Sequence, residues 1–264
     1  TSTGANVTTG EGVGDFPVLV RLNASNFDFD QLSDQSGGTD LRFAAEDGSH
    51  LYYEIERCEP SSKVAEVWVR TDTIAVNNST QYFTMYWGKS GAADSSNSAA
   101  VFDTANGFAY AWHMDEDGTD ISDATYNDLT GVRNGTPSRG TGMVGYGQLF
   151  DGDNDYFRTG NENIISGHTT DNITISTWAY KDNDVNGQFM VHKPATGLSN
   201  FELRFNTGDS IDVYMDGGRT SDQQCDEQAW VYVAARWDGS NLNTFVNSVK
   251  SEDKEKTGSF DAST

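Results

Sequence analysis

Apolar and polar residues alternate with a period of two in many short stretches of this chain. Residues 81–88, for example, place Phe83, Met85 and Trp87 on one side of an extended segment and the intervening residues on the other. Such alternation is typical of β-strands, whose successive side chains point to opposite faces. No window shows the i, i+3, i+4, i+7 apolar spacing of an amphipathic helix over three turns. The pattern predicts an all-β protein.

The strands fall into two groups. Five strands are expected in the first hundred residues, two of them around an Asp47-Gly48 turn: 16–22, the two halves of 41–56, 64–70 and 81–88. Later strands are expected at 108–114, 147–151, 155–159, 173–180, 187–193, 201–206, 211–215, 229–237 and 243–249. Residues 88–106 are small and polar and contain the interdomain connection. We therefore expect an N-terminal β-sandwich domain at 1–100, a linker at 101–106 and a second sandwich at 107–264.

The amino-acid composition limits the classes of binding partner that this chain can have. The formal net charge of −23 would repel phosphate backbones and anionic lipid surfaces, so we expect no nucleic-acid partner and no direct membrane insertion. The same acidity is compatible with divalent cation binding or with a simply solvated surface. The two cysteines, Cys58 and Cys225, are too few for a disulfide framework, and whether they pair is open.

Several segments resemble known families. An uncharacterised bacterial β domain is similar to this chain at residues 15–29, 38–48, 53–56, 64–70 and 81–103. The laminin-G-like, concanavalin A-like family resembles it at residues 111–118, 123–136, 147–157, 173–180 and 230–240. The first kind of domain commonly precedes the second in secreted and surface proteins. The same pair of domains also occurs ahead of some MotA/TolQ/ExbB-type proton-channel subunits.

The resemblance carries expectations about fold and role. It implies that the second domain is a concanavalin A-like jelly roll that binds sugars or protein surfaces without doing chemistry. Domains of this family usually end in a strand with an Asp-Glu pair and an aromatic residue, and residues 258–264 stop before it. We therefore expect a sandwich that is incomplete at its C-terminus, with the remainder of its own polypeptide as one partner. The location implied is extracytoplasmic: secreted, cell-surface or periplasmic.

Acidic loops make calcium the candidate cofactor, because Ca²⁺ prefers six to eight oxygen ligands. Laminin-G-like sandwiches often hold such an ion, and the candidate ligands are Asp115, Glu116 and Asp123, followed by Asp151 and Asp153. Asp-rich β-turns between strands explain the same residues without a metal.

Aromatic side chains are the candidates for sugar contacts, because flat rings stack on sugar C–H faces. Trp237 stands beside an Asp-Gly turn, where we expect it to be exposed, while Tyr53 and Trp87 each belong to a pair of adjacent aromatics of which one points outward. Trp112, Trp178 and Trp230 are expected in the core.

Catalysis is the weaker alternative. Some concanavalin A-like sandwiches are glycoside hydrolases with acidic residues alternating on one strand, and Glu54, Glu56 and Glu59 come nearest to that pattern. Our main hypothesis is a non-catalytic module that binds a glycan or a cell-surface protein. The alternatives are a structural domain, of a surface fibre or of the periplasmic part of a proton-channel complex, and a glycoside hydrolase.

Overall fold

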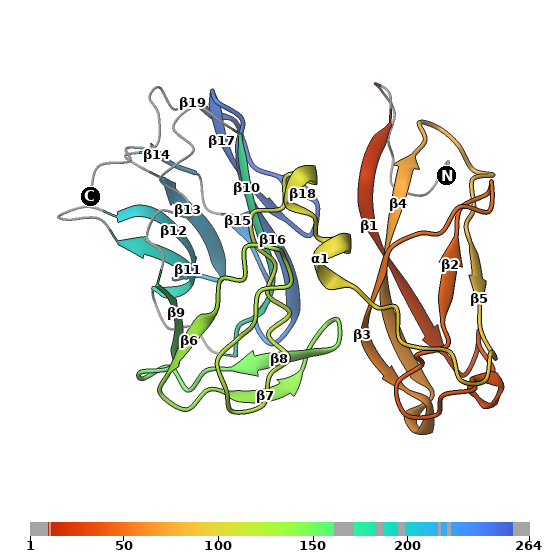
Figure 1. Cartoon of the computed structure of the whole chain (residues 1–264). Helices are drawn as coiled ribbons and strands as arrows, with labels where there is room; N and C mark the ends of the chain where they lie inside the picture. The colour runs from red at the N-terminus through yellow and green to blue at the C-terminus, as the bar shows by residue number, and fades with distance from the viewer. Residues whose placement is uncertain are drawn as a thin grey trace. The chain divides into compact units, whose positions relative to one another are not determined.

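The computed structural model describes residues 10, 12–160, 172–182, 187–194, 199–215, 218–220 and 223–255 (Figure 1). The chain divides into two compact units, Thr1–Gly160 and Asn161–Thr264, and each is described here by itself. Regular structure is nearly all strand, which confirms the all-β prediction. The division between the units falls after Gly160, whereas the sequence pattern placed the linker at 101–106; residues 107–160 lie in the first unit.

The first unit begins with a small two-layer sandwich (Figure 1). Its antiparallel sheet has the order β1–β4–β3, and a second pair of strands is formed by β2 and β5. The bounds are β1 (Val13–Asn23), β2 (Arg42–Ala44), β3 (Tyr53–Glu59), β4 (Val64–Ile74) and β5 (Thr84–Tyr86). Alternation along β4 sends Val67 and Val69 into a core with Phe29, Phe43 and Tyr53, all of them fully buried. The outward residues of the same sheet are largely charged.

Short helices follow and precede these strands: η1 (Phe29–Gln31), η2 (Pro60–Ser62), α1 (Ser98–Val101) and η3 (Thr104–Asn106). The Asn97 side chain caps α1 by accepting a hydrogen bond from the Ala100 amide, as residues of this type commonly do. Val101 and Phe102 are buried and pack against Trp68. The predicted linker therefore includes a packed segment. None of the helices among the described residues is long and apolar enough to span a membrane.

The rest of the first unit contains two small antiparallel pairs, β6 with β9 and β7 with β8. Their bounds are β6 (Gly131–Asn134), β7 (Ser138–Thr141), β8 (Tyr146–Leu149) and β9 (Tyr156–Thr159). The strand predicted at 108–114 was wrong, because this segment pairs with no strand. Side chains bind its backbone instead: the Ala111 amide donates to Asp123 Oδ1 (3.0 Å), and Asn127 Nδ2 donates to the Ala109 carbonyl (2.7 Å).

The second unit is a sandwich of two antiparallel sheets, as predicted. One sheet has the order β10–β16–β17–β18 with β19 also on β17, and the other has the order β11–β12–β13–β14 with β15 also on β13. The bounds are β10 (Ile173–Tyr180), β11 (Gln188–Pro194), β12 (Ser199–Asn206), β13 (Ser210–Met215), β14 (Gly218–Arg219), β15 (Gln223–Gln224), β16 (Trp230–Trp237), β17 (Asn241–Val246), β18 (Val249–Lys250) and β19 (Lys254–Glu255).

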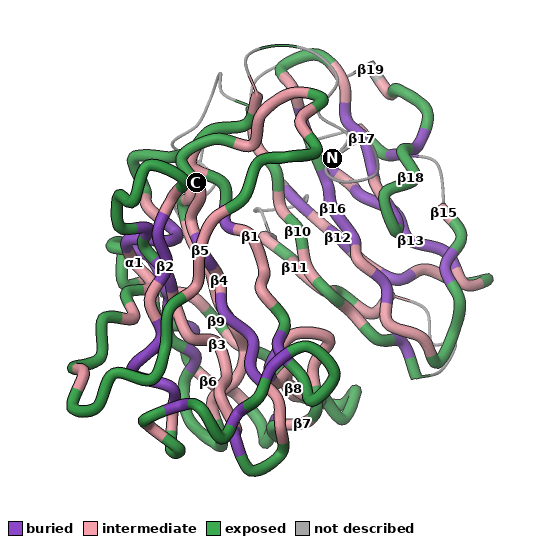
Figure 2. Tube along the Cα trace, turned by 90° about the vertical axis from the view of Figure 1, so that its right-hand side faces the viewer, coloured by how far each residue is buried: buried purple, intermediate pink, exposed green. Residues whose placement is uncertain are grey.

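Its core lies between the two sheets. Phe201, Leu203 and Val213 from one sheet meet Val233 and Leu242 from the other, and all five are fully buried. Figure 2 shows the buried positions along β13 and β17. Because a strand alternates its side chains, the residues between these positions point out of the sandwich.

Candidate functional site

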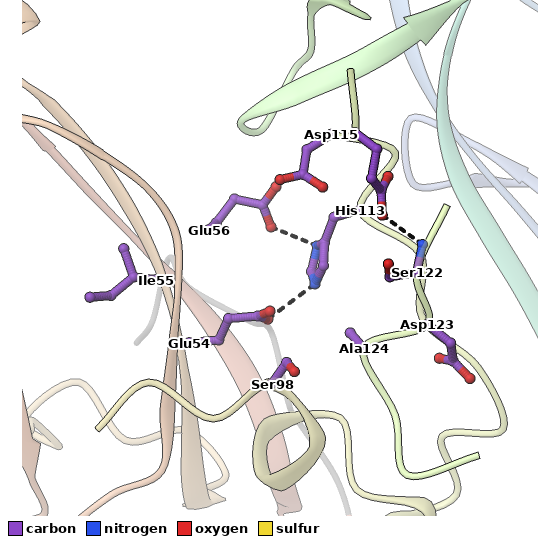
Figure 3. Close-up of a pocket in the computed structure, with 10 residues that line it drawn as sticks. Glu54, Ile55, Glu56, Ser98, His113, Asp115, Ser122, Asp123 and Ala124 are labelled. Atoms are coloured by element: carbon purple, nitrogen blue, oxygen red, sulfur yellow. Dashed lines mark hydrogen bonds and ion pairs between the residues drawn. The ribbon is translucent and has the colours of Figure 1, made fainter. Parts of the chain in front are cut away.

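The first unit contains an acidic cavity of about 290 Å³ (Figure 3). Five carboxylate side chains and one imidazole line it, together with two serines and two apolar side chains. The ionisable residues are Glu54, Glu56, His113, Asp115, Glu116 and Asp123. Three of the five predicted calcium ligands, Asp115, Glu116 and Asp123, thus come to the same cavity.

A bulge in β3 brings the two glutamates to this cavity. Glu54 pairs with Trp68 and Ile55 pairs with Val67, but the next paired residue is Arg57, so Glu56 is an extra residue. A bulge of this kind redirects a side chain and interrupts the ladder. The free edge of β3 is bound by the segment just before α1, because the Asn97 amide donates to the Tyr53 carbonyl (2.8 Å).

His113 lies between the two glutamates. Its Nδ1 is 2.6 Å from Glu56 Oε2 and its Nε2 is 3.1 Å from Glu54 Oε2. Glu56 also accepts a hydrogen bond from Trp68 Nε1 (2.9 Å), and its side chain is 2 % exposed. Burial by itself would lower the pKa of His113, but the hydrogen bonds and charges of Glu54 and Glu56 hold that pKa well above 6.5. The group is therefore an imidazolium held by two carboxylates.

Asp115 and Glu116 complete the acidic wall. Figure 3 shows the carboxyl groups of Asp115 and Glu56 pointing toward one another. Burial, followed by the negative charges of Glu116 and Glu56, raises the pKa of Asp115. Glu116 Oε1 accepts a hydrogen bond from the Ser122 amide (2.6 Å), and its Oε2 is buried with no hydrogen-bond partner. The Asp115 carboxyl therefore keeps its proton to a higher pH than an ordinary aspartate, because its pKa is raised.

Asp123 organises the loop beside the cavity. Its carboxylate accepts hydrogen bonds from the amides of Ala111 (3.0 Å), Thr125 (3.0 Å) and Leu129 (3.1 Å). The Thr125 hydroxyl donates to it as well (2.9 Å). Four donors occupy the oxygen lone pairs that a cation would need.

Asp151 and Asp153 lie in the turn before β9. Asp151 Oδ1 accepts from the Asp153 amide (2.9 Å), and the Asp151 amide donates to Asp155 Oδ2 (3.0 Å). The arrangement is that of an Asp-rich turn whose carboxylates bind nearby amides. Across the parts of the chain that the structure describes, no three His, Cys, Asp or Glu side chains are placed to hold a metal ion. Calcium binding stays a prediction.

The aromatic residues expected to contact a sugar are placed differently from the prediction. Trp237 is 2 % exposed and Tyr53 is fully buried, so the expectation that Trp237 is exposed was wrong, and Tyr52 rather than Tyr53 is the outward member of its pair. The reason is strand alternation, which sends both side chains into their cores. Trp87 is 39 % exposed, and its Nε1 donates to Gln31 Oε1 (3.0 Å).

A larger set of outward aromatics lies in the second unit. We call the side chains of Trp178, Tyr180, Trp230 and Tyr232 the aromatic face; they stand on the outer side of β10 and β16. Trp178 and Tyr180 are 40 % and 45 % exposed, so the prediction that Trp178 belongs to the core was wrong. The alternation of residues 173–180, with isoleucines on one side and Ser176, Trp178 and Tyr180 on the other, carried this signal in the sequence.

The hydrolase candidates are bound to basic or aromatic partners. Glu54 and Glu56 contact His113, and Glu59 Oε1 accepts a hydrogen bond from the Tyr146 hydroxyl (2.5 Å). Glu59 lies outside the set of residues that line the acidic cavity. Glu54 and Glu56 therefore face a bound imidazolium, and each lacks the open approach of a nucleophile in a cleft.

Comparison with known families identifies both parts of the chain. Residues 37–116 match a family described as a domain of unknown function (DUF2341), and residues 151–264 match the concanavalin A-like lectin/glucanases superfamily. The chain thus carries a DUF2341 domain followed by a concanavalin A-like domain, which confirms the resemblance and the jelly-roll prediction. No curated protein and no solved structure matches it.

Proposed function

We propose that this chain is a non-catalytic carbohydrate-binding module of a larger extracytoplasmic protein. The observation that carries the proposal is the aromatic face, which stands on the outer side of a sheet in the concanavalin A-like unit. Exposed tryptophan and tyrosine combine an apolar ring with a polar tip, which suits sugar C–H faces and hydroxyls. Single exposed aromatics are common, but two exposed and two half-buried rings on adjacent strands form a patch that favours ligand contact.

The first unit fits a supporting role in this proposal. Five of its charged cavity residues, namely Glu54, Glu56, His113, Glu116 and Asp123, are bound to one another or to backbone amides. Its outward charged strands contact residues 98–146 of the same unit. We propose that it presents the binding unit, with a glycan or a cell-surface protein as the external partner. Calcium, if it takes part, would draw on Asp115 and Glu116, whose carboxylates have fewer amide donors than Asp123.

The direct test is binding of the whole chain to immobilised polysaccharides, measured with calcium and then with a chelator. We expect saturable binding to at least one polysaccharide and no binding to the bare matrix. A requirement for calcium would appear as loss of binding in the chelator. Absence of binding to every polysaccharide in both conditions would contradict the proposal and favour a structural or assembly role.

Glycoside hydrolysis is a second candidate because of one observation. The Asp115 carboxyl, whose pKa is raised, lies beside the Glu56 carboxylate that is paired with His113, and two neighbouring carboxyl groups in different environments are the arrangement of glycosidases. Release of reducing ends from the bound polysaccharide would support it. The Asp115→Asn and Glu54→Gln variants should then lose that release while retaining binding, and unchanged release in both would exclude the cavity as its source.

A further inference from the structure

We infer that the aromatic face is the ligand site and that its ligand is an uncharged polysaccharide chain lying along β10 and β16. This inference rests on the proposed function, because it names the site and the ligand class of the binding that we propose. Trp237, Tyr53 and Trp87 are not part of this site.

The geometry of the face suits a chain of sugars better than one sugar. Trp178 lies beside Tyr232 with ring centroids 5.2 Å apart, and Tyr180 lies beside Trp230 with centroids 5.7 Å apart. In each pair, the two residues stand directly opposite one another on the hydrogen-bonded strands β10 and β16. The pairs are two residues apart along the strand, which corresponds to a step of about 7 Å. Two successive aromatic contacts at this step can engage consecutive or nearby rings of an extended polymer.

The chemistry around the rings favours sugars over a protein partner. The outer positions of β10 are Thr174, Ser176, Trp178 and Tyr180, and no Leu, Ile, Val or Met stands at the outer positions of β10 or β16. Hydroxyl groups and amphipathic rings can bind sugar hydroxyls while stacking on C–H faces. Aromatic rings are also common at protein-docking faces, so it is the Thr174 and Ser176 hydroxyls on the same side of β10 that favour a sugar ligand.

Charge selects the kind of polysaccharide. The one charged residue at the outer positions of these two strands is Arg236, whose Nη2 is already 2.7 Å from Asp238 Oδ2. Lys181 follows Tyr180, but its side chain is fully buried with Asp209 at 3.1 Å. With a net charge of −23, the chain would repel uronate or sulfated polymers. The face therefore offers no counter-charge to an acidic glycan.

The experiment compares binding of the whole chain to soluble neutral and acidic polysaccharides by affinity electrophoresis and calorimetry. The neutral probes are xyloglucan, mixed-linkage β-glucan and galactomannan, and the acidic probes are alginate and polygalacturonate. We expect binding to a neutral probe, with roughly tenfold weaker binding for Trp178→Ala and for Tyr180→Ala. Trp178→Phe should retain most of the affinity because it keeps a ring.

The matched control is Phe189→Ala. Phe189 is 48 % exposed in the same unit but stands on β11 in the other sheet, stacked on His192 with centroids 4.6 Å apart. Its removal should leave the affinity unchanged. Neutral-glycan binding that persists in both Trp178→Ala and Tyr180→Ala would overturn this inference while the proposed function survives. Preferential binding of an acidic probe would also overturn it, and no binding to any probe would overturn the proposed function itself.

Discussion

The outer side of β3 and β4 in the first unit and the outer side of β10 and β16 in the second unit are built on the same plan but have opposite surroundings. Both sheets bury Val-rich inner positions. In the first unit the outer positions include Glu54, Glu66 and Arg70, and residues 98–146 cover them. In the second unit the outer positions include the four rings of the aromatic face, of which Trp178 and Tyr180 are exposed to solvent.

The difference shows how a polar sheet face can become an interior. Glu66 is 5 % exposed, and it accepts a hydrogen bond from the Gly145 amide (2.7 Å) while pairing with Arg57 (3.0 Å). Trp68 packs edge-on against Phe102 with centroids 5.9 Å apart. Charges that are buried must be paired or hydrogen-bonded, and here almost every one finds such a partner in the covering segment. The aromatic face needs no such partners and can stay open.

Removing the His113 imidazolium from the outer side of β3 should have the largest effect on the stability of the protein. His113→Ala leaves Glu54 and Glu56 close together without their shared cation, and breaking a buried ion pair costs about 3–5 kcal/mol. Urea unfolding, with hydrogen exchange to assign the transition to the first unit, would measure the loss. His50→Ala, at an exposed histidine of the same unit, is the control and should change stability by less than about 0.5 kcal/mol. Equal effects in the two variants would show that the buried triad is dispensable.

Gly145, in the segment that covers β3 and β4, tests how closely this segment packs against Glu56. Gly145 has φ +59°, and a Cβ there would lie 2.5 Å from Glu56 Oε1. We expect Gly145→Ala to cost about 2–3 kcal/mol, from backbone strain and from displacement of the glutamate. Gly152→Ala is matched for backbone, since φ is +79° with no atom within 4 Å, and should cost about 1 kcal/mol. A smaller cost at position 145 than at position 152 would contradict the close contact.

Alkaline pH should lower the stability of the first unit without a mutation. The folded-state pKa of His113 is raised above 6.5, so its contribution to stability is complete below pH 6.5 and is lost as the pH rises through the raised value. The free energy of unfolding of the first unit should fall over this range, by less than in His113→Ala. The His113→Ala variant should lose this component of the pH dependence, and identical pH profiles would refute the assignment.

Substitutions in the aromatic face should give the smallest change in stability. Trp178 is 40 % exposed, so Trp178→Ala should cost less than about 1 kcal/mol in the second unit. Trp237 is 2 % exposed and should cost about 3–5 kcal/mol when replaced by alanine. Thermal unfolding of both variants compares the two sides of one sheet, and a large loss in Trp178→Ala would mean that the aromatic face is covered in solution.

Much of the fold could be read from local patterning. Period-two alternation gave β1, β4, β10 and β16 and their inward apolar residues, because one apolar side chain in two is enough to cover one side of a sheet. It also indicated which residues face outward, but the choice of side was missed at Tyr53, Trp178 and Trp237. An aromatic residue fits either side of a strand, so its identity does not reveal whether its side chain points into the core or outward. Its position in the alternation with neighbouring aliphatic residues does reveal it.

The amino-acid sequence by itself determined the strands, the division of side chains between two sides of each sheet, and the acidity that disfavours anionic partners. Tertiary structure alone decided that residues 108–114 bind side chains instead of a strand, and that a bulge brings Glu56 to His113. These contacts join residues well beyond one strand apart, from Ala111 with Asp123 to Glu56 with His113, and no local period encodes which group will satisfy a backbone amide or a buried charge.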